Sequence, residues 1–179
     1  MNILEKKEEI TEEMKQSIES DLDNLRFRLD GIAERLKIVG KSAEHYKPKE
    51  WRLYNSTQVV NAIDSVLFAK AYIGKLLGDL GIPTPYQNDG KRKEIGDIEP
   101  AAHKHDEPIT EEFLKLNYIE MIDTSREEIE VQCANIMKIK QNGSKVFSYV
   151  GNIYSTTAFE RLTDAKIWLG FELGRLRDN

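Results

Sequence analysis

The chain has 179 residues, of which 32% are charged, and a formal net charge of −5. This acidic balance argues against a general binder of nucleic-acid polymers or anionic membranes, but it leaves room for a small anionic ligand held by local cations. Cys133 is the only cysteine, which excludes an intrachain disulfide. With neither a signal peptide nor an apolar run of roughly 18 residues, we expect a cytoplasmic protein that does not cross a membrane.

The first part of the chain predicts two helices. Residues 3–39 predict one long helix, in which the apolar side chains from residue 18 to residue 39 follow alternating steps of four and three, the spacing of a helical seam, and Gly40 is placed to end this helix. Residues 41–56 form a connection rich in aromatic and cationic side chains. Residues 57–80 return to the same apolar spacing, and Gly81 predicts the end of the second helix.

The second part repeats this order after a long connection. Residues 82–110 hold four of the five prolines and predict a linker or crossover loop. Residues 110–140 have helical spacing, with a candidate break at 123–125. Residues 144–154 form a second aromatic connection, and residues 155–176 predict the last helix.

Two helical segments of the chain resemble each other closely. AKAYIGKLLGDL at 69–80 and AKIWLGFELGRL at 165–176 align without gaps, 96 positions apart. We interpret the match as a duplication. It predicts an all-α protein of two antiparallel helical hairpins, residues 1–81 and 111–179, packed about a pseudo-two-fold axis in a four-helix arrangement. The alternative is an extended tandem of hairpins that buries its apolar faces only on oligomerisation.

Each of these segments places a lysine and glycines beside the apolar side of its helix. With about 100° per residue, Lys70 and Lys166 fall inside a wide apolar arc, and Gly74 and Gly170 lie beside them. Structural explanations exist for both residue types: small residues allow close helix packing, and a lysine can reach water or a carboxylate on a neighbouring helix. The functional alternative is an anion site, because a lysine among apolar side chains requires a negative partner.

The two connections supply further candidate ligand-binding residues. These are Trp51, Arg52 and Tyr54 before the second helix, and Lys145, Tyr149 and Tyr154 before the last one. Aromatic faces stack nucleobases and cations bind phosphates, although each aromatic is also suited to ordinary packing. Two pseudo-equivalent sites of this kind predict a two-fold ligand with two phosphates and two bases, such as a cyclic dinucleotide.

The hairpin layout and the motif Ala-Lys-x-aromatic-aliphatic, at 69–73 and 165–169, resemble a phage-encoded group of anti-CBASS and anti-Thoeris helical-hairpin sponges. Members of that group are small oligomeric proteins that bind cyclic oligonucleotide or cyclic ADP-ribose immune signals without cleaving them. The resemblance implies an anti-defence protein that forms a homo-oligomer and sequesters such a signal in the cytoplasm of the infected bacterial host. The long heptad N-terminus and the two hairpins in one chain depart from the group's pattern.

Signals of catalysis are weak in this sequence. His103 and His105 lie in the proline-rich linker, where such a pair is more often a polar loop than a metal site, and no phosphate-binding glycine loop or nucleophile motif occurs. We therefore expect neither an enzyme, nor a cofactor, nor a metal. The alternative function is a protein–protein interaction module, in which the heptad seam at 18–39 pairs with a partner helix and no small ligand is bound.

Overall fold

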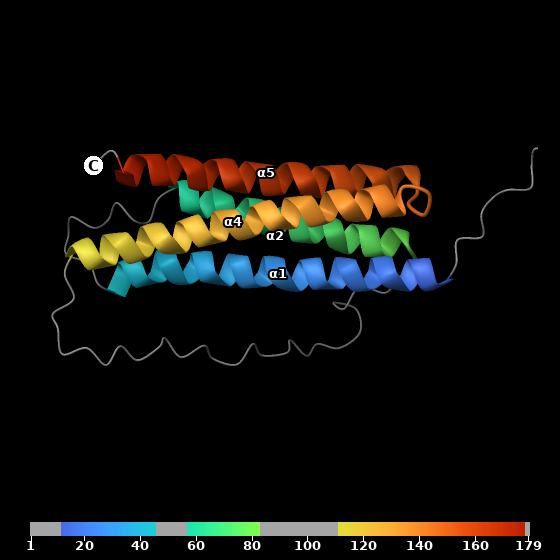
Figure 1. Cartoon of the computed structure of the whole chain (residues 1–179), viewed down its shortest axis with the longest axis horizontal. Coiled ribbons are helices and arrows are strands. Elements are labelled where there is room, and N and C mark those ends of the chain that lie inside the picture. The colour runs from blue at the N-terminus through green and yellow to red at the C-terminus, as the bar shows by residue number, and fades with distance from the viewer. Residues whose placement is uncertain (1–11, 46–56, 83–110, 178–179) are drawn as a thin grey trace, which may run out of the picture.

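Four long helices make up the described part of the chain, which comprises residues 12–45, 57–82 and 111–177 of a computed structural model. The helices are α1 (Glu12–His45), α2 (Thr57–Asp79), α4 (Glu111–Gly143) and α5 (Tyr149–Arg177) (Figure 1). These residues contain no strand, and the predicted all-α class is confirmed. The predicted hairpins correspond to α1 with α2 and to α4 with α5.

The helices form a four-helix bundle in which each helix contacts two neighbours. α1 packs against α2 and α4, and α5 packs against the same two helices, so the order around the bundle is α1, α2, α5, α4. Figure 1 shows the four rods side by side, each running antiparallel to its two neighbours. The bundle therefore has two seams within the hairpins, α1–α2 and α4–α5, which lie on opposite sides of it.

The apolar core repeats from one hairpin to the other. Leu22 and Leu29 of α1 are fully buried, and so are Ile122 and Ile129 of α4, which lie 100 positions later. In α2 and α5 the shift is 96 positions, and the buried residues there again coincide: Val66, Ala69, Ile73 and Leu77 with Leu162, Ala165, Leu169 and Leu173. This coincidence supports a duplicated hairpin and a pseudo-two-fold axis perpendicular to the helices.

The ends of α2 and α5 are set by local capping. At the end of α2, Gly81 has a φ of 75°. Its N–H donates a hydrogen bond to the carbonyl of Gly78, and the N–H of Ile82 donates one to the carbonyl of Leu77. This is the Schellman arrangement, which favours glycine at the left-handed position, so the predicted end is confirmed. At the start of α5, the Ser148 hydroxyl accepts the N–H of Gly151 at 3.0 Å and acts as the N-cap.

Three predicted boundaries are wrong. α1 continues through Gly40 to His45, because one glycine weakens a helix by about 1 kcal/mol without ending it. α4 has no break at 123–125, since Ser125 is fully buried and the helix packs on its neighbours on both sides of that point. α5 begins at Tyr149 rather than 155, because its cap at Ser148 was overlooked.

Candidate functional site

Both predicted ligand lysines are already paired with carboxylates of their own chain. Lys70 Nζ bonds Asp30 Oδ1 across the α1–α2 seam, and only 15% of the lysine side chain is exposed. Lys166 Nζ lies 2.8 Å from Glu130 Oε2 across the α4–α5 seam. The hydrogen bond from Lys166, followed by its charge, holds the pKa of Glu130 below its ordinary value of 4.5. The lysines lie within the apolar arc as predicted, but they are not the unpaired cations on which the predicted anion site depended.

The glycines beside these lysines face arginines. A methyl group added at Gly74 would lie 3.7 Å from Arg26 Cζ, and one added at Gly170 would lie 3.7 Å from Arg126 Nε. Each hairpin seam therefore repeats one cluster, in which a guanidinium of the first helix lies against a glycine of the second, next to an ion pair. The close approach that these two glycines permit is to an arginine side chain rather than to a helix backbone.

The two clusters do not converge on one ligand. The cluster of Lys70 lies on the α1–α2 seam and that of Lys166 on the α4–α5 seam, which are opposite sides of the bundle. A small ligand such as a cyclic dinucleotide cannot contact both lysines while the core of the bundle lies between them. The predicted two-fold site between the lysines is therefore not formed within one chain.

The predicted aromatic residues do not gather around the lysines either. Tyr154 packs against Tyr72 of α2, with ring centroids 6.1 Å apart, and Lys75 Nζ lies 4.8 Å and 5.6 Å from the two rings. Tyr154 lies twelve residues before Lys166 on the same helix, about 18 Å away at 1.5 Å per residue. Tyr149, which is 82% exposed, lies still further from it.

The remaining candidates separate into two groups. Lys145 is exposed in the short connection between α4 and α5, at the same end of the bundle as Tyr149. Trp51, Arg52 and Tyr54 lie outside the described residues, as does the linker that holds the two predicted metal-loop histidines. Among the candidates that the structure describes, the aromatic residues therefore do not gather with the two lysines into one site.

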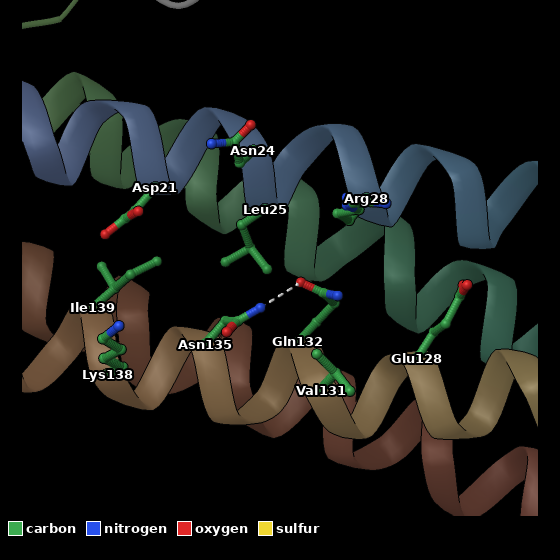
Figure 2. A pocket seen from close by; sticks show the side chains of 10 residues that line it. All are labelled: Asp21, Asn24, Leu25, Arg28, Glu128, Val131, Gln132, Asn135, Lys138 and Ile139. Carbon is green, nitrogen blue, oxygen red and sulfur yellow. Dashed lines mark hydrogen bonds between the residues drawn. The ribbon is translucent and has the colours of Figure 1, made fainter.

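A cavity of about 410 Å³ lies instead between α1 and α4 (Figure 2). Its polar wall contains two cations, Arg28 of α1 and Lys138 of α4, two carboxylates, Asp21 and Glu128, and three amides, Asn24, Gln132 and Asn135. Within the part of the chain that the structure describes, neither cation forms an ion pair. We call this cavity the α1–α4 groove.

The groove has a defined arrangement along its length. In Figure 2, Asp21, Lys138 and Ile139 lie at one end, Arg28 and Glu128 at the other, and the amides between them. Gln132 is only 6% exposed, and its Oε1 accepts a hydrogen bond from Asn135 Nδ2 at 3.0 Å. Such a surface can bind a negative group at either end and can hydrogen-bond a polar ring in the middle.

The three amides of the groove occur in only one half of the pseudo-symmetric α1–α4 interface. Shifted by 100 positions, Gln132 corresponds to Ile32 and Asn135 corresponds to Arg35, which bonds Glu128 at 2.6 Å. Sequence reasoning missed the groove because its residues resemble an ordinary solvated helix face. The signal that would have found it is the difference between the two hairpins at equivalent positions of their first helices.

Other kinds of site find no support in the described residues. Within residues 12–45, 57–82 and 111–177, no three histidine, cysteine or acidic side chains gather as metal ligands do. None of the described helices contains a stretch long and apolar enough to cross a membrane. No protein-family model, curated protein or solved structure matches the chain.

Proposed function

We propose that the protein binds and sequesters a small anionic signal of the nucleotide type in the α1–α4 groove, without cleaving it. The observation that carries this proposal is a cavity of about 410 Å³ whose wall holds Arg28 and Lys138, neither in an ion pair with another described residue, together with three amide side chains. Small-molecule sites commonly have volumes of about 300–1,000 Å³ with a few convergent polar groups.

The chemistry of the groove suits a phosphate-bearing ring system. Arg28 can bind a phosphate with two parallel hydrogen bonds, and Lys138 supplies a second positive charge at the other end. The amides of Gln132 and Asn135 offer both donors and acceptors to the edge of a base. Among the lining residues there is no histidine, cysteine or hydroxyl side chain, and one of the two carboxylates, Glu128, is bonded to Arg35, so the groove offers little for nucleophilic or acid–base cleavage.

We extend the proposal to the kind of signal that the sequence resemblance implies. The ligand would be a cyclic oligonucleotide or a cyclic ADP-ribose isomer, removed from a host receptor in the cytoplasm of an infected bacterium, and the protein would be a homo-oligomer. The duplicated hairpin and the repeated Ala-Lys motif support this extension. Lys70 and Lys166 have no direct part in it, because the structure gives both lysines carboxylate partners.

A second candidate function is contact with another protein. The heptad seam is not available for a partner helix, since Ile18, Leu22 and Leu29 are buried within the bundle. The outer surfaces of α2 and α5 nevertheless expose large apolar side chains, including Phe68 at 57% and Phe171 at 59%. Exposed aromatic residues of this size are typical of interaction surfaces.

A ligand panel tests the first proposal and separates it from the second. The full chain is titrated with cyclic dinucleotides, cyclic trinucleotides and cyclic ADP-ribose isomers while thermal unfolding and calorimetric heat are followed. We expect at least one compound to bind and to be recovered intact after heat denaturation. Loss of binding is expected in Arg28→Gln and Lys138→Gln, with binding retained in Lys70→Gln. Cleaved nucleotide would indicate an enzyme, and no binding of any compound would refute the proposal.

A further inference from the structure

We infer that Arg35 is a positioning residue for the α1–α4 groove: by holding Glu128, it leaves Arg28 available to an anion. This inference rests on the proposed function for its consequence, but its structural basis is independent. Arg35 Nη1 donates a hydrogen bond to Glu128 Oε2 at 2.6 Å. Arg35 does not line the groove, whereas Glu128 and Arg28 both do, at the same end of it (Figure 2).

The geometry of α1 places two arginines around one carboxylate. Arg28 and Arg35 are seven residues apart, so they lie on one face of the helix, two turns and about 10.5 Å from each other. Glu128 approaches that face from α4, and it is committed to Arg35. Glu128 bonds Arg35 through Oε2, and within the described residues no ion pair joins it to Arg28, so Arg28 keeps an open hydrogen-bonding edge.

The pairing also decides the charge of the groove. With Glu128 held by Arg35, the end of the groove at Arg28 has a cation whose charge no bonded carboxylate offsets. Without Arg35, the nearest guanidinium for Glu128 on that helix face is Arg28. Both members of the present pair are partly exposed, with 33% and 41% of their side chains accessible, so the carboxylate has room to turn. The ion pair of Glu128 with Arg28 would then compete directly with an incoming phosphate.

The internal duplication shows that this arrangement is not required by the fold. The equivalents of Arg35 and Glu128 in the other half of the interface are Asn135 and Arg28, so the charge pair is replaced there by an amide and a guanidinium. One half of the interface is closed by an ion pair, and the other is an open groove with a cation. The pair at Arg35 stabilises this asymmetry by holding Glu128, a carboxylate at the same end of the groove as Arg28, in the closed half.

Two measurements on the full chain test the inference. The first is a double-mutant cycle between Arg28→Gln and Glu128→Gln, measured by urea unfolding in the parent protein and in Arg35→Gln. We expect little coupling in the parent and clear favourable coupling in the Arg35→Gln background, where the carboxylate has moved to Arg28. Absence of coupling in that background overturns the inference, whether or not a ligand is known.

The second measurement is calorimetric binding of inorganic pyrophosphate and of the nucleotide panel. We expect Arg35→Gln to weaken binding about tenfold, the effect of losing one charge-assisted contact, and Arg35→Gln/Glu128→Gln to restore it. Arg177→Gln is the matched control, because it breaks a comparable interhelical pair with Asp123, 2.7 Å long, at the α4–α5 seam rather than at the α1–α4 interface. Unchanged affinity in Arg35→Gln overturns the inference, whereas a parent protein that binds no compound refutes the proposed function instead.

Discussion

Replacing Arg175 by alanine should destabilise the bundle far more than an ordinary surface arginine does. Glu172 of α5 is completely buried, and its carboxylate receives hydrogen bonds from Arg175 Nη2 at 2.6 Å and Nε at 3.0 Å, and from the Tyr118 hydroxyl at 3.2 Å. Without Arg175, a buried carboxylate would be left with one neutral donor. This state is unfavourable because the charge can be neither hydrated nor compensated.

The size of the effect follows from burial. Removing one partner of a buried ion pair typically costs about 3–5 kcal/mol, and the lower end applies here because the Tyr118 hydroxyl remains as a donor to the carboxylate. In a chain of this length, about 3 kcal/mol lowers the melting temperature by roughly 6–12 °C. Glu172→Leu should cost less than about 1 kcal/mol, since its equivalent in the first hairpin is the fully buried Leu76 and Arg175 is exposed enough to turn towards water.

Urea unfolding followed by circular dichroism measures both variants against the parent. Arg177→Ala serves as the control, because its pair with Asp123 is largely exposed and should contribute little. We expect the parent protein, Glu172→Leu and Arg177→Ala to have similar free energies of unfolding. Arg175→Ala should be clearly less stable than all three. Equal losses in Arg175→Ala and Glu172→Leu would refute the reasoning, since the cost would then come from lost packing rather than from a stranded charge.

Three further outcomes are expected. Lys70→Ala should lower the free energy of unfolding by about 1 kcal/mol, and Lys166→Ala should lower it by less, because the partner carboxylate of Lys166 is the more exposed of the two. Urea unfolding measures both effects. Loss of nucleotide binding without loss of stability would return these lysines to a ligand-binding role. Gly78→Ala and Gly174→Ala should each stabilise the protein by about 0.5–1 kcal/mol, because no atom lies within 4 Å of the added methyl group; a lower melting temperature would contradict this. Glu130 has a lowered pKa in the folded state, so its ion pair with Lys166 stabilises the protein above pH 4.5, and this stabilisation is lost as the pH falls through the pKa of the folded state. Glu130→Gln should therefore flatten the acid side of a plot of melting temperature against pH. An unchanged slope there would count against the pairing.

The sequence predicts the helices well because their apolar spacing is regular. Seam positions such as Leu22 and Leu29 are buried as expected, and Gly81 ends α2 where its left-handed conformation is needed. Boundaries failed where the deciding contact was short and local, as at the Ser148 cap, or where packing outweighed a weak breaking signal, as at Gly40. Apart from the break expected at 123–125, which would have divided α4, these errors moved ends of helices without changing their order.

The carboxylate partners of the two candidate lysines were missed for a different reason. Helical periodicity correctly placed Lys70 beside the apolar face, but it cannot identify the residue that faces it from another helix. Asp30 is 40 positions away, and only the register of α1 against α2 brings the two together. The groove cannot be recognised in the sequence either, because only the packing of α1 against α4 brings Gln132 and Arg28 to the wall of one cavity.

The duplication provides an internal comparison that separates folding residues from binding residues. The cluster of Arg26, Lys70 and Gly74 recurs in the second hairpin as Arg126, Lys166 and Gly170, at the same place and with the same contacts, as expected of features that both hairpins need in order to pack. The amides and unpaired cations of the groove occur once. Because both halves of the α1–α4 interface face the same packing problem, the fold alone gives no reason for that difference. A ligand bound on one side of the pseudo-two-fold axis does give one, so the residues that break the repeat are the ones to mutate first.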